Sequence, residues 1–217
     1  MDVLEAQVAI QRIRDLSRIT SPIVIAVDGR SGTGKSTLSA WIAGQVDATL
    51  IDQDDFYAGG AIETWQRLTP QEKADRVINW RRVRAQVLQP LRAGTPASWQ
   101  PFDWETMEGL AAEPITAQPS SMVILDGAYS SRPELADVID LSILVTLPDA
   151  LRRARLRQRE GEDFMSEWHA IWDDAEEYYF DAVRPPETFD VGIHRSADAQ
   201  NDRGSRPRRV SEEDDRF

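Results

Sequence analysis

One short segment of the sequence combines the residue types that bind phosphate groups. Residues 29–36 read Gly-Arg-Ser-Gly-Thr-Gly-Lys-Ser, a glycine followed by four residues and then Gly-Lys-Ser. Glycines let the backbone turn so that its N–H groups face a phosphate, and the start of a helix adds positive potential. In this pattern we expect Lys35 to contact the β- and γ-phosphates of ATP and the Ser36 hydroxyl to contact Mg²⁺. The candidate ATP-binding residues are Gly29, Ser31, Gly32, Thr33, Gly34, Lys35, Ser36 and Thr37.

The same pattern can also arise in a glycine-rich turn that binds no ligand. From the residue frequencies of this chain we expect a chance match in roughly one such sequence in a thousand, and in fewer once a preceding strand and a following helix are required. Of the 25 lysines and arginines, only Lys35 and Lys73 are lysines. A lysine at this place in an arginine-rich chain favours a requirement for a slender, flexible ammonium group.

Three aspartates follow apolar runs that are typical of buried strands. Asp28 ends the first run, Asp54 follows the second and Asp126 ends the third. Ligands of doubly wound sheets bind beyond the carboxyl ends of the strands, so we expect these aspartates near the phosphate loop. Asp54 is the candidate base for a hydroxyl proton, and Ser36, Asp54 and Asp126 are the candidate Mg²⁺ ligands. The alternative is that the aspartates cap helices or shape turns, and we expect a structural role for Asp28.

The segment 149–159 carries five arginines, although the chain as a whole has a net charge of −12. A helix with these residues could close over the triphosphate and neutralise charge in the transition state. Arg155 and Arg159 are four residues apart and therefore share one helical face. The alternative is that the arginines pair with the acidic run at 173–177. The candidate catalytic residues are Lys35, Asp54, Arg155 and Arg159.

The elements that must position these residues alternate between short β-branched runs and segments of helical periodicity. Parallel strands need crossover connections, which place helices on both faces of the sheet. The pattern predicts an α/β fold with a doubly wound parallel sheet in three α/β/α layers. Residues 95–121, rich in proline, are predicted to form a long functional loop without regular structure. Strands are predicted at 23–27, 49–51, 122–125, 141–147 and 189–193, and helices at 1–19, 36–46, 69–91, 149–159 and 166–183.

Composition limits the class of protein. The 217 residues are 41% hydrophobic and 29% charged, which suits one soluble catalytic domain at 21–194 behind an N-terminal helix at 1–20. The tail at 195–217 is too polar to bury a core, and we expect it to be disordered. No apolar run approaches the roughly 18 residues of a membrane span, so we expect a cytoplasmic protein without a membrane partner. The negative charge argues against nucleic acid as a partner, and the absence of cysteine leaves any metal to oxygen ligands.

Taken together, these motifs resemble the uridine kinase family over residues 22–193. The resemblance implies a nucleoside kinase-like P-loop NTPase fold with a lid helix, which phosphoribulokinase and pantothenate kinase relatives share. It further implies transfer of the γ-phosphate of ATP to a hydroxyl, with Asp54 as base and Arg155 and Arg159 in the lid. The motifs that carry it are residues 28–37, Gln53–Tyr57, Pro101–Trp104, Ile124–Gly127 and Arg152, Arg155 and Arg159. By this resemblance, the acceptor pocket would include Tyr57, Asn79, Asp103 and Trp104.

Two positions depart from the family pattern. Asn79 stands where the family carries an aspartate for the ribose hydroxyls, and Met107 stands where a histidine recognises the base. Because an amide lacks charge and a thioether forms no strong hydrogen bond, we expect uridine to be a poor substrate. A sugar phosphate or a vitamin precursor is the alternative acceptor, and a non-catalytic ATP-binding regulator is the alternative function; a homo-oligomer also stays open. His169 and His194 are predicted to be incidental.

No Asn-Lys-x-Asp tetrad for guanine recognition occurs in the sequence, which disfavours a switch GTPase. ATP is therefore the expected donor.

Overall fold

Five parallel strands form the central sheet of the computed structural model, which describes residues 3–161 and 164–196. Their order across the sheet is β2-β5-β1-β6-β7, so the chain winds to both sides of β1. Val27 lies opposite Asp126, and Asp126 in turn lies opposite Asp52, which brings three strand ends together. The strands are β1 (Ile23–Asp28), β2 (Ala48–Asp52), β5 (Met122–Asp126), β6 (Leu141–Thr146) and β7 (Val191–His194).

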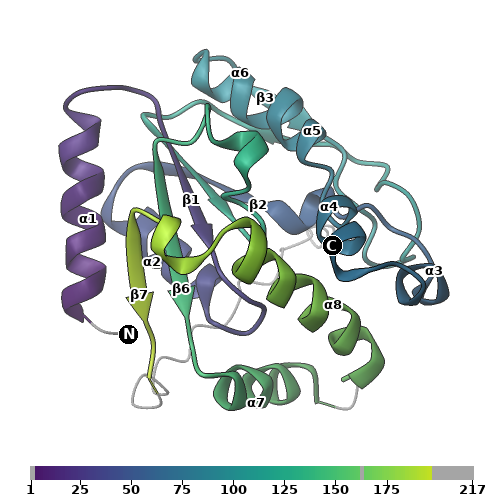
Figure 1. Cartoon of the computed structure of the whole chain (residues 1–217). Coiled ribbons are helices and arrows are strands. Elements are labelled where there is room, and N and C mark those ends of the chain that lie inside the picture. Colours follow the sequence, from purple (N-terminus) through teal and green to yellow (C-terminus); the bar gives the residue numbers. More distant parts are fainter. Residues whose placement is uncertain (1–2, 162–163, 197–217) are drawn as a thin grey trace, which may run out of the picture.

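The sequence of β1 explains why helices cover both faces of the sheet. Successive side chains of a strand point to opposite faces, and all six residues of β1 are buried. Ile23 and Ile25 pack with residues of α1 (Val3–Ser17) and α2 (Lys35–Gln45) in one apolar cluster. Val24 packs in a second cluster with residues of α8 (Ser166–Tyr178). Figure 1 shows α1 and α8 on opposite sides of the strands, the layered arrangement that the sequence predicted.

The predicted strands are all present, each within two residues of its expected ends. The predicted helix at 69–91 is divided, because a turn at residues 77–79 interrupts it. Thr69 begins the first part with a capping box, in which its hydroxyl accepts from the Glu72 N–H and the Glu72 carboxylate accepts from the Thr69 N–H. The segments are α4 (Pro70–Arg76), α5 (Trp80–Arg82), a π-helical turn (Val83–Leu88) and α6 (Gln89–Arg92).

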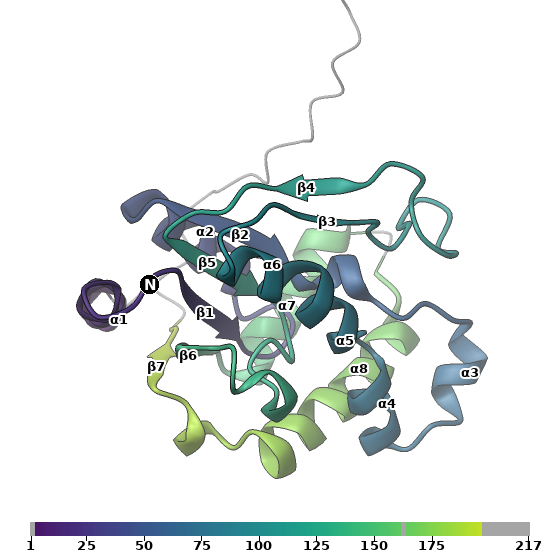
Figure 2. The same cartoon turned by 90° about the horizontal axis from the view of Figure 1, so that it is seen from above.

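The prediction of no regular structure at 95–121 is wrong in part. β3 (Ala97–Trp99) and β4 (Ile115–Ala117) form a separate antiparallel pair, with Trp99 opposite Ile115. Figure 2 shows this pair lying outside the central sheet. Three-residue strands leave almost no alternation to detect, and prolines flank both of them. Residues 100–114 between the two strands form a long loop.

Further short helices connect the larger elements: α3 (Ile62–Gln66) and 3-10 turns at Gln53–Phe56, Pro133–Leu135 and Pro186–Thr188. α7 (Asp149–Glu160) follows β6 and lies beyond the carboxyl ends of β6 and β7, at the bottom of Figure 1. α8 runs into a π-helical turn at Tyr179–Val183. No helix within residues 3–161 and 164–196 has the length and apolar character to cross a membrane.

Both ends of the described chain join this core. Ile10 and Ile13 of α1 are buried in the cluster beneath the sheet, so the N-terminal helix is part of the domain packing. The prediction of disorder from residue 195 onward is wrong for Arg195. The Arg195 N–H donates to the Thr146 carbonyl and extends the pairing of β7, while its side chain is buried. The rest of the predicted tail, 197–217, lies outside the described residues.

Candidate active site

The phosphate loop, residues 29–36, connects the end of β1 to the start of α2, as predicted. Gly29 and Gly32 both have positive φ, at 145° and 82°. A Cβ atom at Gly29 would come 2.2 Å from the Val145 carbonyl oxygen, and one at Gly32 would come 2.7 Å from the Arg152 carbonyl oxygen. Side chains at these two positions would force the loop away from β6 and α7. The sequence therefore keeps a closely packed backbone loop at the N-terminus of α2, which suits phosphate binding.

Lys35 lies over this loop. Its Nζ atom donates to the Arg30 carbonyl at 3.2 Å, and its charge acts on the carboxyls of both Asp28 and Asp126. The ammonium group is therefore held between the loop and the strand ends. This is the place from which the predicted contact with the β- and γ-phosphates can be made.

Asp28 holds the loops around the site together, in agreement with its expected structural role. Its carboxylate is fully buried and accepts from the backbone N–H groups of Gly29, Tyr129 and Ser131 at 2.8–3.0 Å. The Tyr179 hydroxyl donates to it at 3.0 Å. Burial raises the pKa of Asp28, against the lowering effect of these hydrogen bonds and of Lys35. The loops after β1 and β5 and the end of α8 are thereby fixed to one carboxylate.

Asp126 lies where the predicted metal site requires a carboxylate. It is buried at the end of β5, and one of its oxygens accepts from the Ser39 hydroxyl at 3.0 Å. Burial raises its pKa, while Lys35 and the Ser36 hydroxyl lower it and Asp52 raises it further. Ser36 and Asp126 therefore form an adjacent pair of oxygen donors, a set that suits Mg²⁺.

Asp54 lies directly after β2, in the 3-10 turn Gln53–Phe56. Its N–H donates to the Asp52 carboxylate at 3.0 Å, and its side chain lines a cleft of about 1090 Å³. In the described part of the chain no three His, Cys, Asp or Glu residues are grouped closely enough to hold a metal ion by themselves. The predicted set of Ser36, Asp54 and Asp126 contains two carboxylates. Asp52 adds a third carboxylate nearby, since it lies opposite Asp126 in the sheet and accepts from the Asp54 N–H. Metal ligation by this set stays a prediction.

The cleft joins the phosphate loop to the predicted acceptor pocket. Ser31 and Asp54 line one part of it, and Tyr57, Asp103 and Trp104 line another. The wall is aromatic: the Tyr57 and Trp104 rings stack with centroids 5.2 Å apart, and Phe102, Trp168 and Trp172 surround Tyr57. The Asp103 carboxylate accepts from the N–H groups of Glu105 and Thr106, which lower its pKa and keep it ionised.

Asn79 and Met107 are corrections to the predicted acceptor pocket. Asn79 caps α5, where its side-chain oxygen accepts from the Arg82 N–H at 3.2 Å, and it is exposed outside the residues that line the cleft. Met107 is also exposed and sits in a turn with φ of 59°, outside the lining as well. Alignment by sequence spacing fails here because the helix break at residues 77–79 and the 100–114 loop are both irregular.

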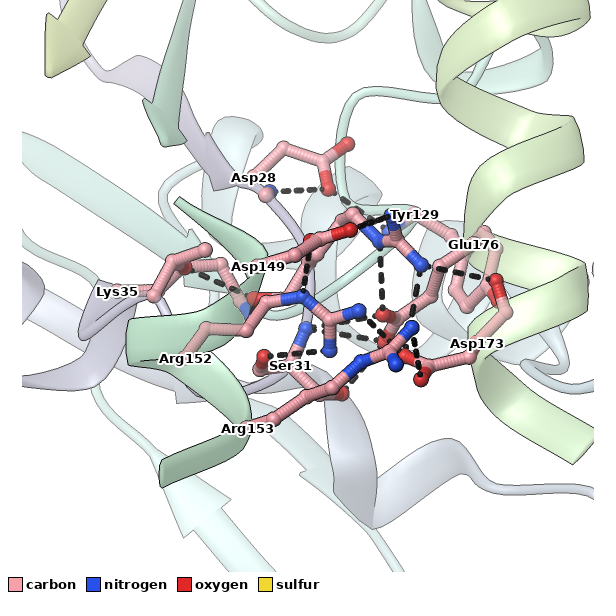
Figure 3. Close-up of polar contacts among 12 residues, drawn as sticks. Asp28, Ser31, Lys35, Tyr129, Asp149, Arg152, Arg153, Asp173 and Glu176 are labelled. Atoms are coloured by element: carbon pink, nitrogen blue, oxygen red, sulfur yellow. Dashed lines mark hydrogen bonds and ion pairs between the residues drawn. The ribbon is translucent and has the colours of Figure 1, made fainter. Parts of the chain in front are cut away.

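The arginines of α7 divide into two groups. Arg152 is fully buried, and its guanidinium donates to Asp149, to Asp173 and to the Ser31 carbonyl. Arg153 also pairs with Asp173, at 3.2 Å. Figure 3 shows Arg152 and Arg153 reaching from α7 toward Asp173 on α8. For these two arginines the alternative of pairing with the acidic run is confirmed, and they connect α7 to α8.

Arg155 lies beside the phosphate loop, and Arg159 lines the cleft. An Arg155 guanidinium nitrogen lies 3.4 Å from the Thr33 carbonyl oxygen of the phosphate loop. Arg159 is more than half exposed, lines the cleft and donates to Glu160 at 2.8 Å. Burial lowers the pKa of Arg155, which stays far above neutral pH. The geometry is consistent with the predicted lid role, which stays a prediction.

Glu176 is the most important site residue that the sequence analysis missed. Its buried carboxylate accepts from the Ser31 N–H at 3.0 and 3.1 Å and from the Ser31 hydroxyl. Arg30 lies beside it, with its Nε atom 3.7 Å from a Glu176 oxygen. Figure 3 shows Glu176 pointing from α8 to Ser31. Trp168, Trp172 and Glu176 recur at intervals of four, and this helical stripe was the available signal.

Two further residues beside the site, His169 and Arg195, were missed or misjudged. His169, predicted to be incidental, lines the cleft, hydrogen-bonds Glu160 at 2.6 Å and stacks on Phe164. His194, by contrast, pairs with Glu5 away from the cleft. Arg195 donates to the Gly34 carbonyl at 2.9 Å, which adds a second guanidinium beside the phosphate loop.

Comparison with known proteins agrees with this geometry. A uridine kinase of Lactobacillus helveticus (strain DPC 4571) is 22% identical over 176 residues, which cover 78% of this chain and 81% of that protein. A uridine kinase of Latilactobacillus sakei subsp. sakei (strain 23K) is 26% identical over 175 residues, which cover 78% and 79%. No protein-family model matches the chain.

Two solved structures show the same fold. A possible uridine kinase from Bacillus stearothermophilus superposes with a TM-score of 0.61 at 18% identity, over 84% of this chain and 97% of that chain. A proposed fructose transport system kinase from Silicibacter sp. TM1040 gives a TM-score of 0.62 at 22% identity, over 80% and 90%.

The parallel sheet, the phosphate loop and the cleft beside it, together with these relatives, identify a P-loop α/β fold of the nucleoside kinase-like type. The predicted resemblance to the uridine kinase family is confirmed, and the chain is uridine kinase-like in sequence and in fold.

Proposed function

We propose that the protein transfers the γ-phosphate of ATP to a hydroxyl group of a small molecule. One observation carries the proposal: the phosphate loop residue Ser31 and the candidate base Asp54 line the same cleft as the aromatic wall around Tyr57. A donor phosphate and an acceptor hydroxyl could thus meet within one cleft. The uridine kinase relatives support phosphotransfer as the class of reaction.

The residues present suit ATP with Mg²⁺. The loop from Gly29 to Ser36 leads into the start of α2, and glycine at positions 29 and 32 lets its backbone pack where a side chain would clash with β6 and α7. The Ser36 hydroxyl and the Asp126 carboxylate would hold the metal, which when bound supplies positive charge to the phosphate oxygens.

Each of the candidate catalytic residues has a separate task. Asp54 would accept the proton of the attacking hydroxyl. Lys35, Arg155 and Arg159 would stabilise the charge that spreads over the transferred phosphoryl group. Glu176 would hold Ser31, and with it the entrance of the phosphate loop, in place.

The acceptor is the open part of the proposal. A nucleoside is supported by the uridine kinase relatives, and a non-nucleoside acceptor is the alternative. Asn79 and Met107 do not line the cleft, so their departures from the family pattern do not decide between the two. A regulator that only binds ATP would have no use for Asp54 in the cleft wall. We therefore favour an enzyme over a non-catalytic binding module.

The test is a coupled assay of ADP formation with ATP and Mg²⁺ against a panel of nucleosides, sugars, sugar phosphates and pantothenate-like compounds. We expect acceptor-dependent ADP formation that Lys35→Ala lowers by about 100-fold or more, because no other group replaces its charge. The thermal midpoint of the variant, measured in parallel, shows whether the fold is kept. Undiminished turnover in a folded Lys35→Ala variant would contradict the assignment of the phosphate loop.

A further inference from the structure

We propose that the acceptor of this kinase carries a positive charge, as an amino alcohol or an amino sugar does. This inference rests on the proposed phosphotransfer and names the chemical class of its acceptor. Three features of the cleft carry it: its charge, its aromatic wall and one buried hydroxyl.

The first feature is the charge of the cleft. Eight of the residues that line it are aspartates or glutamates, and within the described chain Arg159 is the one lysine or arginine among them. Four of these acids lie at or after the end of β2 or on α8, close to the phosphate loop, where the loop or a nucleotide-bound metal can balance their charge: Asp52, Asp54, Asp55 and Glu176. The loop at 100–114 and the end of α7 contribute the others: Asp103, Glu105, Glu113 and Glu160.

This second group makes the side of the cleft away from the phosphate loop acidic. Hydrogen bonds from backbone N–H groups lower the pKa of Asp103, and Glu105 and Glu113 are exposed. Glu160 is paired with Arg159 and His169, which leaves the acidic residues of the loop unmatched. A carboxylate or phosphate on the acceptor would be repelled by this wall, whereas an ammonium group would be attracted. A sugar phosphate is therefore a poor match.

The second feature is the aromatic wall. Tyr57, Trp104, Trp168 and Trp172 all line the cleft, and Trp104 is 44% exposed, so that part of its ring is available to a ligand. The Tyr57 ring lies within 6.0 Å of the Trp104, Trp168 and Trp172 rings, so the aromatic groups act as one surface. Aromatic faces attract ammonium groups, and they do so more strongly when the site excludes water. A cation in the cleft would therefore be attracted both by the carboxylates and by the aromatic faces.

The third feature is one hydroxyl group in the cleft wall. Tyr129 lines the cleft and is buried, and its hydroxyl has no hydrogen-bond partner within the described residues. Burial raises the pKa of Tyr129, so the hydroxyl stays protonated. Buried polar groups are normally hydrogen-bonded, and this one would be satisfied by a hydroxyl of a polar ligand.

The experiment compares ligands that differ in charge alone. One set is choline, its neutral isostere 3,3-dimethyl-1-butanol and the anion 3-hydroxypropionate; a second is D-glucosamine, D-glucose and D-glucose 6-phosphate. Binding is measured by tryptophan fluorescence with Mg²⁺ and a non-hydrolysable ATP analogue, and transfer is measured with ATP. We expect at least one amine to bind about tenfold or more tightly than its neutral counterpart, and the anions to bind more weakly still.

A matched pair of variants tests the origin of the preference. Glu105→Gln with Glu113→Gln removes two charges from the cleft, whereas Glu63→Gln with Glu187→Gln removes two exposed charges that do not line it. We expect the first variant to reduce the preference for the amine several-fold and the second to leave it unchanged. An equal effect of both variants would contradict a local role for the cleft carboxylates.

Failure of this inference can be told from failure of the proposed function. If the nucleotide analogue binds but neither amine binds more tightly than its neutral partner, or an anion binds best, the positive charge of the acceptor is refuted while the kinase assignment stands. If the nucleotide analogue itself does not bind with Mg²⁺, the proposed function fails first.

Discussion

The carboxylate of Glu176 accepts two hydrogen bonds from Ser31, one from its N–H and one from its hydroxyl, across 145 positions of sequence. A glutamate on α8 thereby fixes the third residue of the phosphate loop. Arg30, next to Ser31, is held on the same helix by the Asp173 carbonyl at 3.1 Å. The entrance of the nucleotide site is therefore positioned by the helix that also carries Trp168 and Trp172 of the cleft wall.

Replacing Glu176 by glutamine tests this connection. The amide oxygen can still accept from the Ser31 N–H, but the charge that faces Arg30 is lost. We expect kcat/KM for ATP to fall about tenfold, equivalent to about 1.4 kcal/mol, mainly through a higher KM. The neighbouring Glu177 is exposed, and Glu177→Gln is the control. A fall in the thermal midpoint with unchanged kinetics would assign Glu176 to stability alone.

Replacing Asp54 by asparagine separates nucleotide binding from phosphoryl transfer. An amide cannot accept the hydroxyl proton, so transfer should fall by about 100-fold or more while affinity for ATP stays within about threefold. Affinity is measured by titration with the ATP analogue and transfer by single-turnover kinetics. Asp52→Asn and Asp55→Asn, made alongside, identify the base if transfer survives in Asp54→Asn.

Arg152 and Arg153 are adjacent but should differ in their effect on stability. Arg152 is fully buried between Asp149 and Asp173, and its removal breaks a buried ion pair with each of them, although Arg30 still lies near both carboxylates. We expect Arg152→Met to lower the free energy of unfolding by about 3–5 kcal/mol. Arg153 is about half exposed, and Arg153→Met should cost about 1 kcal/mol or less. Urea unfolding of both variants checks this, and equal losses would contradict the division of α7 into two groups.

Acid should weaken one contact at the end of α7. Burial opposes ionisation of Glu160, but hydrogen bonds from His169 and Arg159 outweigh it and lower its pKa from the ordinary 4.5. The pKa of Glu160 in the folded state lies below its pKa in the unfolded state. The carboxylate therefore stabilises the fold fully above the unfolded-state pKa, and this stabilisation is lost as the pH falls through the folded-state pKa.

We therefore expect Glu160→Gln to reduce the free energy of unfolding by up to about 1 kcal/mol at pH 5.5, and by less at pH 3. Urea unfolding at both pH values measures the difference from the wild type. Glu167→Gln, at an exposed position, serves as the reference. A difference that does not change with pH would mean that Glu160 acts through packing.

The fold could be predicted because the buried strands are continuous apolar runs. β1 is apolar from Ile23 to Val27, and its alternation between two apolar clusters follows from burial on both faces. β3 and β4 could not be found in the same way. Their three residues each are ordered by pairing between Ala97–Trp99 and Ile115–Ala117, which is a contact between distant segments and leaves no local periodicity.

The site was predictable where chemistry is local in sequence. The phosphate loop has a fixed spacing, and Asp54 and Asp126 follow strands, so the sheet brings them to one edge. Glu176 acts through a tertiary contact, and Arg195 was hidden because polar residues follow it in the sequence. Asn79 failed as a candidate because the chain needs it as a helix cap.

The loop at 100–114 has a consequence for how such enzymes can diversify. It provides Trp104, Asp103 and the exposed acids of the cleft, and it is joined to the domain through the pair β3 and β4 and through Phe102, whose N–H donates to the Asp55 carbonyl at 2.7 Å. Changes of length within a surface loop cost little folding free energy, since the closure entropy grows only slowly with length. The phosphate loop, built into β1 and α2, would be untouched by such changes. New acceptors can therefore be reached by exchanging one peripheral segment, which makes this loop the natural target for redesign of specificity.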